Sequence, residues 1–237
     1  MAGKKTTGKL FIDFLCQLHP LFPLPADISI LHPYQDKDVR KILATFYNTY
    51  YNDTHPRILI LGINPGRLGA GITGIPFTDP AHLTNPLRIA HHFAPKKELS
   101  GAFIYEMIEA YGGPQKFFRH FLLSSLCPLG FIKGGKNLNY YDLKILQEAA
   151  TPFIRESIEK QKALMQRLPV CLCLGEGKNY RYFRALNEVH QWFSHILPLP
   201  HPRFVMQYRR KEKKNYIALY LEKLGEARQL SGHRFGV

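Results

Sequence analysis

The sequence predicts an α/β fold, a three-layer α/β/α sandwich around a central, mainly parallel sheet of four strands. Four short apolar runs are spread along the chain, stretches with helical spacing of apolar residues separate them, and a turn rich in glycine or proline closes each run. Unbroken apolar runs suit strands that are buried on both faces. We therefore expect helices on both sides of the sheet.

The chain length and composition suit one domain of this kind. The 237 residues are 45% hydrophobic and 21% charged, which is ordinary for a globular protein. The sequence shows no internal repeat, so a single domain over residues 1–237 is expected. No apolar run approaches about 20 residues, and no long apolar core follows the first five residues. Neither a membrane span nor a secretory signal is therefore expected.

The first elements follow from local patterns. Helical spacing of apolar side chains predicts helices over residues 10–18 and 38–51, with a proline-rich extended connector between them. The run at residues 58–61 is the first strand, and it ends at a glycine–proline turn. The glycine-rich segment 67–78 lacks the Gly-Lys-Ser/Thr end of a Walker A motif. We expect it to be a long loop that wraps a flat ligand, with Phe77 as a stacking face.

The rest of the chain continues the alternation of helix and strand. The remaining strands are predicted at 121–126, 169–174 and 195–199, and helices at 103–111, 115–120, 142–166 and 211–224, with one more whose apolar face carries Tyr182, Leu186, Val189 and Phe193. Residues 142–166 are expected to form one or two helices, with a break near Thr151-Pro152. The segment 134–137 is expected to be a flexible basic loop, and the tail after Gly225 is expected to be loose.

The four cysteines indicate a reducing compartment. They form no CxxC pair, and Cys171 and Cys173 lie two apart, on one face of a strand. Small core residues are the expected role of all four, with iron–sulfur ligation as the alternative. We expect an intracellular protein, cytoplasmic in a bacterium or nuclear in a eukaryote, that needs no metal and no other cofactor.

The charge balance points to an anionic partner. The chain has 32 Lys and Arg against 18 Asp and Glu, a formal net charge of +14. Nucleic acid, an anionic membrane and phosphorylated substrates all fit such an excess, and a merely basic soluble protein is the alternative. Six basic side chains lie with interleaved aromatics in the segment Arg203–Lys214. This pattern suits phosphate contacts and base stacking, unless it is a solvated helix face.

Two polar residues follow predicted strands directly. Asn64 comes after the first strand and His201 after the fourth. The carboxyl ends of parallel strands open on one edge of a sheet, where ligands of such folds bind. Asn64 offers both a donor and an acceptor, and two prolines restrict the backbone beside His201. We expect them to share one cleft, against the alternatives of a simple strand-exit turn and a structural histidine.

The segment 62–77, Gly-Ile-Asn-Pro-Gly-Arg-Leu-Gly-Ala-Gly-Ile-Thr-Gly-Ile-Pro-Phe, resembles the first motif of the uracil-DNA glycosylase superfamily. It is most similar to the single-strand-selective monofunctional (SMUG) branch. Ser125-Leu-Cys-Pro-Leu129 resembles the middle motif, His201-Pro202 the second motif, and the segment 117–120 is also similar. The resemblance covers residues 55–225 and implies a monofunctional glycosylase of base-excision repair. Such an enzyme flips uracil, or a modified base such as 5-hydroxymethyluracil or xanthine, and hydrolyses its N-glycosidic bond to leave an abasic site.

The resemblance also implies roles for individual residues. Asn64 would orient or activate the attacking water, and His201 would hydrogen-bond the base carbonyl as negative charge develops. Phe77 would stack on the flipped base, unless it is a core residue under the loop. The remaining substrate-binding residues would be Ile63, Gly66, Ser124 and Ser125, and the DNA-binding residues Arg203, Gln207, Arg209, Arg210 and Lys211.

Two positions depart from the family pattern. Ser125 stands where the family usually has an asparagine that reads the pyrimidine edge, so base choice is open. Arg203 directly follows Pro202, whereas the family usually has His-Pro-Ser-Pro-Arg, so the intercalating residue is open too.

Three alternatives to this function are considered. The mismatch-specific uracil/thymine branch usually lacks the histidine of His201-Pro202. A non-catalytic DNA-binding protein on the same fold would have no need to keep both Asn64 and His201. An enzyme acting on free nucleosides would have no need of the basic excess. The expected partner is single- or double-stranded DNA that contains deaminated bases. The protein is expected to be a monomer and to bind no membrane.

Overall fold

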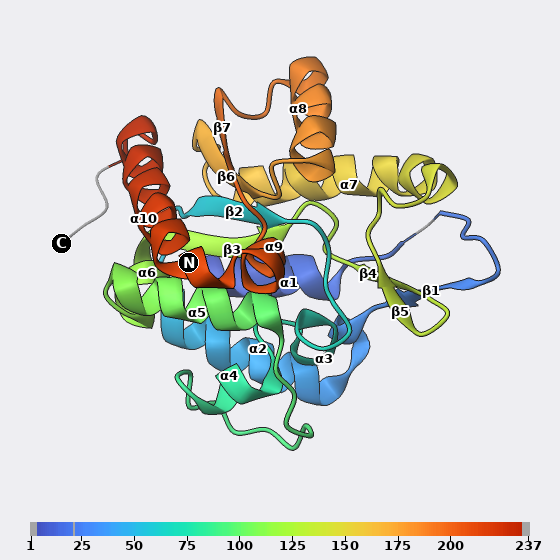
Figure 1. The fold of residues 1–237 in the computed structure, drawn as a ribbon, viewed down its shortest axis with the longest axis horizontal. Helices are drawn as coiled ribbons and strands as arrows, with labels where there is room; N and C mark the ends of the chain where they lie inside the picture. Colours follow the sequence, from blue (N-terminus) through green and yellow to red (C-terminus); the bar gives the residue numbers. More distant parts are fainter. Residues whose placement is uncertain (1–3, 21, 234–237) are drawn as a thin grey trace.

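The computed structural model describes residues 4–20 and 22–233, and it has helices on both sides of a parallel sheet (Figure 1). The sheet comprises β2 (Ile58–Gly62), β3 (Phe121–Ser125), β6 (Val170–Leu174) and β7 (His195–Leu199). Their order is β3-β2-β6-β7, and every neighbouring pair is parallel. The predicted α/β/α sandwich with a four-stranded sheet is confirmed.

The strand sequences explain the order of the sheet. All residues of β2, β3 and β6 are buried, as expected of apolar runs with helices on both faces. β7 contains Pro198, which has no N–H to donate and suits an edge strand. Gly62 pairs with Ser125, so β2 and β3 end at the same level.

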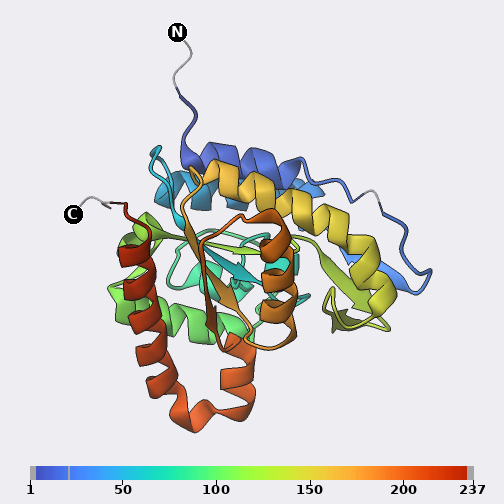
Figure 2. The ribbon, with the colours of Figure 1, turned by 90° about the horizontal axis from the view of Figure 1, so that it is seen from above.

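Helices cover the two faces of the sheet as the crossovers require. Figure 2 shows the sheet between α5 (Leu99–Tyr111) and α10 (Lys213–Leu230) on one side and α7 (Lys144–Leu164) and α8 (Lys178–His190) on the other. The chain passes from β2 to β3 and then back across β2 to β6. Crossovers between parallel strands are right-handed as a rule, so two crossovers that run in opposite directions place their helices on opposite faces.

Shorter elements complete the molecule. α1 (Thr7–Cys16) packs against α2 (Lys37–Tyr50) and α7. The other helical elements are η1 (Pro33–Gln35), α3 (Ala70–Thr73), α4 (Pro80–Thr84), α6 (Pro114–His120), α9 (Pro202–Tyr208) and η2 (Arg210–Glu212). Within the described residues, no helix combines the length and the apolar character that crossing a bilayer requires.

A second, antiparallel sheet was not predicted. It consists of β1 (Ile28–Leu31), β4 (Gly130–Lys133) and β5 (Lys136–Leu138), in the order β1-β4-β5, and Figure 1 shows it at one end of the molecule. The prediction of a flexible loop at residues 134–137 is therefore wrong. Gly134 and Gly135 have φ of +54° and +69°, the conformation that a two-residue hairpin turn requires.

Two predictions about helices are also corrected. α7 runs unbroken through Pro152, because its core side, including Ile154 and Ile158, stays buried along the whole helix. α10 continues past Gly225 to Leu230, because Ala227 beyond the glycine is fully buried. The prediction of a loose tail after Gly225 is therefore wrong as far as residue 230. Residues 234–237 lie outside the described part of the chain.

The predicted face of α8 and the predicted glycine-rich loop need smaller changes. Val189 is 75% exposed rather than buried, and Phe193 lies beyond the end of α8. Residues 67–78 contain the short helix α3 instead of being loop throughout. Cys127, Cys171 and Cys173 are buried, as expected, and Cys16 is partly buried.

Candidate active site

A cavity of about 480 Å³ lies at the carboxyl edge of the central sheet. Residues that follow β2 and β7 and the last residue of β3 line it, so distant parts of the chain meet there. The sequence-predicted residues that it brings together are Ile63, Asn64, Gly66, Phe77, Ser125, His201, Arg203 and Gln207.

The side chain of Asn64 is held by backbone atoms on both sides. Its Nδ2 donates to the carbonyl of Leu138 at 3.2 Å, and its Oδ1 accepts from the N–H of Tyr140 at 3.1 Å. Both partners lie at the end of the β4–β5 hairpin or just after it. The carboxamide orientation is therefore set before any ligand enters, and one N–H and one oxygen lone pair remain for a ligand or a water.

His201 is held as a neutral hydrogen-bond donor. Its Nδ1 accepts from the backbone N–H of Arg203 at 3.2 Å, as the N-cap of α9. Burial, together with the positive charge of Arg203, lowers the pKa of His201 to about 4. In the neutral ring, a hydrogen-bonded Nδ1 acceptor leaves the hydrogen on Nε2. His201 can therefore donate to an oxygen in the cavity at neutral pH.

Phe77 forms part of the cavity wall in an unusual backbone conformation. Its φ is +58°, which non-glycine residues seldom adopt. The adjoining turn is held by the hydroxyl of Thr73, which donates to the carbonyl of Thr78 at 2.6 Å. A Cβ on Gly62 would lie 2.7 Å from Cζ of Phe77, and the Phe77 and His201 ring centroids are 6.2 Å apart. Phe77 packs on the core and also presents a ring to the cavity.

The two serines of β3 do not share a role. Ser125 lines the cavity, and its hydroxyl has no hydrogen-bond partner in the described part of the chain. Its carbonyl accepts from Nε2 of Gln161 at 3.2 Å. Ser124 is 1% exposed and is not part of the cavity lining, because successive side chains of a strand point to opposite faces. Ser124, which the sequence predicts to bind substrate, therefore lies outside the cavity lining.

Glu98 is a cavity residue that the sequence did not reveal. Its backbone N–H donates to Oδ2 of the buried Asp79 at 2.6 Å, and its carboxyl lies against the backbone of Gly66 and Gly69. Burial, and then the charge of Asp79, raises the pKa of Glu98 to about 7, against the opposing effects of Arg203 and His82. No motif marks this glutamate in the sequence.

The β4–β5 hairpin and the bend after it supply further polar residues that the sequence did not indicate. Asn137, Asn139 and Tyr141 line the cavity, and Oδ1 of Asn137 accepts from the N–H of Arg67 at 2.9 Å. The only sequence signal was the Gly134-Gly135 pair, which identifies a hairpin turn when both flanks are read as strands.

Part of the basic segment after His201 lines the cavity, and the rest is exposed to solvent. α9 places Phe204 and Tyr208 at the cavity mouth, 42% and 65% exposed. The predicted DNA-binding residues Arg209, Arg210 and Lys211 come after α9 and are exposed, outside the cavity lining. Arg209 lies 3.9 Å from a carboxylate oxygen of Glu212.

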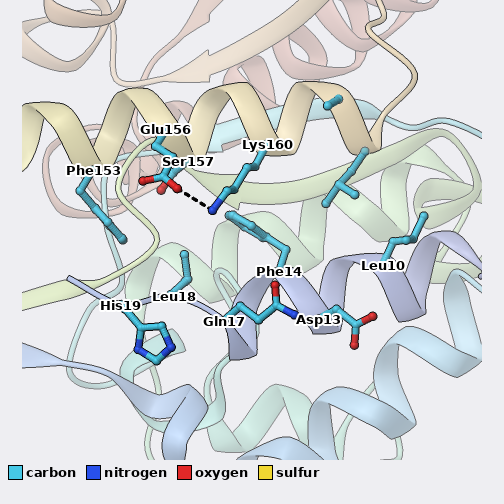
Figure 3. A pocket seen from close by; sticks show the side chains of 12 residues that line it. Leu10, Asp13, Phe14, Gln17, Leu18, His19, Phe153, Glu156, Ser157 and Lys160 are labelled. Carbon is cyan, nitrogen blue, oxygen red and sulfur yellow. Dashed lines mark ion pairs between the residues drawn. The ribbon is translucent and has the colours of Figure 1, made fainter. Parts of the chain in front are cut away.

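A larger cavity, of about 560 Å³, lies between α1 and α7, away from all predicted site residues. Figure 3 shows Phe14 and Leu18 of the α1 side facing Phe153 of α7, with the Glu156–Lys160 ion pair at the rim, 2.6 Å long. It contains neither strand ends nor the polar groups that converge around Asn64. Among the described residues, no three His, Cys, Asp or Glu side chains group as a metal-binding set.

Residues 49–225 match the family described as the Uracil DNA glycosylase superfamily. The single-strand selective monofunctional uracil-DNA glycosylase of Rattus norvegicus is 33% identical over 115 residues, 41% of each chain. The corresponding protein of Mus musculus is 29% identical over 150 residues, 56% of this chain and 53% of the mouse protein. The chain thus spans about half the length of the curated relatives it matches, or less.

A solved structure is similar over nearly the whole chain. The crystal structure of wild-type SMUG2 from Pedobacter heparinus has 41% sequence identity and a TM-score of 0.91. The alignment covers 95% of this chain and 100% of the Pedobacter chain.

Proposed function

This chain belongs to the uracil DNA glycosylase superfamily, and from that premise we propose that it is a SMUG-type monofunctional DNA glycosylase. It removes uracil from DNA by hydrolysing the N-glycosidic bond and leaves an abasic site. The observation that carries the proposal is the cavity in which Asn64 and His201, from two different strand ends, present fixed polar groups to one space. The enzyme acts as a monomer on DNA, inside the cell.

The geometry suggests how each group serves the reaction. The bond between N1 of uracil and C1′ of the sugar breaks, and its electron pair leaves with the base as an anion. Nε2–H of His201 donates to the uracil O2 atom, where negative charge develops, and the ring is already neutral and oriented. The free lone pair of Asn64 Oδ1 holds a water that adds to C1′, and that water's surplus proton passes to solvent.

Phe77 and Ser125 select the base in this proposal. The Phe77 ring stacks on the flipped base, because its backbone already places it on the cavity wall. The Ser125 hydroxyl can act as donor or acceptor and is shorter than an asparagine. The pocket therefore discriminates less tightly than one with an asparagine, and it accepts deaminated purines such as xanthine beside uracil.

A strand-cleavage assay tests the activity. Purified protein is incubated in EDTA with an end-labelled oligonucleotide carrying one deoxyuridine, and alkali then cleaves any abasic site. We expect cleavage only after alkali, and none with Asn64→Ala within the same time. Tight binding of the oligonucleotide without excision by the wild type would instead indicate a DNA-binding protein without catalysis. Excision from free deoxyuridine alone would indicate a nucleosidase.

Base selection is tested on matched oligonucleotides that carry uracil or xanthine at the same position. Ser125→Asn is expected to raise the ratio of uracil to xanthine excision in single-turnover experiments. A site built to hydrogen-bond one edge rejects bases that leave its polar groups unpaired. An unchanged ratio would show that position 125 does not set base preference.

A further inference from the structure

A smaller hollow of about 410 Å³ adjoins the active-site cavity and shares Glu98, Asn137 and Arg203 with it. The rest of its wall includes Arg67, Lys97 and Lys136. We propose that this basic hollow binds one phosphodiester of the DNA strand, next to the nucleotide whose base enters the cavity. The proposal rests on the proposed function, since it assumes a DNA substrate.

The four cations converge from separate parts of the fold. Arg67 follows β2, Lys97 precedes α5, Lys136 lies in β5 and Arg203 in α9. A solvated helix face would draw its charges from one element, whereas four segments have to fold together to form this hollow. The arrangement concentrates positive charge at one point beside the cavity.

These cations form no salt bridge, although the charge of Arg203 acts on Glu98 nearby. Within the described residues, none of the four makes an ion pair, whereas Lys133 in the neighbouring strand pairs with Asp27 at 2.8 Å. Like charges around one hollow repel each other until an anion enters. A phosphodiester supplies that anion, and its release of counterions adds to the affinity.

The frame of the hollow is fixed although its cationic side chains are exposed. The N–H of Arg67 donates to Oδ1 of Asn137 at 2.9 Å, which ties the loop after β2 to the β4–β5 hairpin. On the other wall, Asp79 holds the N–H of Glu98 at 2.6 Å. The shared wall places the hollow where a flipped nucleotide, with its base in the cavity, would carry its backbone.

Glu98 is the one acidic side chain of the hollow, and its charge would oppose a phosphate. Its pKa is raised to about 7 by burial and by Asp79, against Arg203 and His82, and a bound anion raises the pKa further. Glu98 therefore takes up a proton when phosphate binds, and its carboxyl then becomes a donor. Arg67, Lys97 and Lys136, which line the same hollow, supply the attraction that remains.

A double-mutant cycle tests the proposal by binding alone. The ligand is a single-stranded oligonucleotide with one 2′-fluorinated deoxyuridine, which resists hydrolysis, and each flanking phosphodiester is replaced in turn by a neutral methylphosphonate. The variants are Lys97→Ala and Arg67→Ala. Their controls are Lys9→Ala and Arg119→Ala, exposed cations beside the amino ends of β2 and β3.

We expect a methylphosphonate at one of the two positions to weaken the binding of the oligonucleotide to the wild type. The same replacement should weaken its binding to Lys97→Ala and to Arg67→Ala by a factor that is smaller by about two or more. Each variant should also lower the log–log salt slope by about 0.7. The two controls should behave as the wild type. Additive effects at every phosphate would overturn the subsite.

The proton link has its own readout. Wild-type affinity should rise between pH 8 and pH 6, and that of Glu98→Gln should not; an equal rise in both would overturn proton uptake by Glu98. Excision of uracil by the same preparations separates the two proposals. If the protein excises uracil but the effects of variant and methylphosphonate are additive, the phosphate subsite is refuted and the glycosylase activity is not. Coupling without excision would support the subsite and refute the glycosylase.

Discussion

At the scale of single residues, Asn64 serves both the chemistry and the fold. Replacing it by alanine removes its two backbone bonds and leaves the N–H of the buried Tyr140 without its acceptor. We expect single-turnover excision to fall by about two to three decades. The free energy of unfolding, measured with urea, should fall by about 1–3 kcal/mol.

The chain contains a matched control for that prediction. The carboxamide of Asn187 binds both the N–H and the carbonyl of Phe193, at 2.9 and 2.8 Å, outside the cavity lining. Asn187→Ala should lose similar stability and keep full excision. If the two variants lost excision equally, the effect of Asn64 would be one of folding alone.

Glu98 makes a residue-scale prediction about stability. Its folded pKa of about 7 lies above the unfolded value, so the folded state favours the protonated form. The contribution of the Glu98 carboxyl to the stability of the wild type is fully present below about pH 4.5 and is lost as the pH rises through about 7. Glu98→Gln should therefore be more stable than the wild type by about 1–3 kcal/mol at pH 8 and equal to it near pH 4. Urea unfolding at both pH values measures this, and a constant difference would contradict it.

At the scale of elements, the end of β2 depends on a glycine. A Cβ on Gly62 would lie 2.7 Å from the Phe77 ring, so Gly62→Ala has to displace a cavity wall. We expect a loss of about 1–3 kcal/mol in unfolding free energy and a reduced excision rate. Adding Phe77→Ala should remove the stability cost of the alanine, and additive losses would show that the ring is not the obstacle.

Gly225 in α10 provides the opposite case. A Cβ there would meet no atom within 4 Å, and the residue lies inside a helix. Gly225→Ala should stabilise the protein by about 0.5–1 kcal/mol, because glycine loses more backbone entropy on folding than alanine. A rise in the thermal midpoint without a change in excision is the expected result, and a fall would indicate an unseen clash.

The sequence predicted those elements whose pattern was local. β2, β3 and β6 are apolar runs buried on both faces, so four to six residues were enough to identify each. Tertiary packing decided the rest. Pro152 stays within α7 because the residues around it are held against the core, which no local propensity reveals. β4 and β5 are short, and β4 also pairs with β1, a strand about one hundred positions away.

The site divides in the same way. Asn64 and His201 follow strand ends, so a parallel sheet alone brings them to one edge. Glu98 and Asn137 reach the cavity from a helix start and a hairpin, and their positions depend on loop paths that the sequence does not encode locally. The roles of all these residues remain predictions.

At the scale of the whole molecule, the buried His120 and the half-buried His201 set the response to acid. Burial, with Arg203 beside His201 and Arg228 among several cations near His120, lowers the pKa of each ring to about 4. Unfolded chains protonate histidine near pH 6.5, so stability is full above that pH and is lost as pH falls towards 4.

Glu98 titrates with the opposite sign over part of this range, so the experiment uses the Glu98→Gln background. We expect the free energy of unfolding to fall by about 3 kcal/mol for each ring between pH 7 and pH 4. Replacing His120 with a residue that cannot be protonated, His120→Gln, should flatten part of this slope. A free energy that does not change over this range would show that both rings titrate normally.

The two backbone hydrogen bonds of the Asn64 side chain limit how the sequence of this protein can evolve. A bond to the carbonyl of Leu138 and the N–H of Tyr140 does not depend on which side chains the hairpin carries, but it does depend on how many residues it contains. Gaining or losing one residue between positions 133 and 138 would move both anchor atoms away from Asn64. Descendants of this protein should therefore tolerate substitutions in the hairpin far more readily than insertions or deletions.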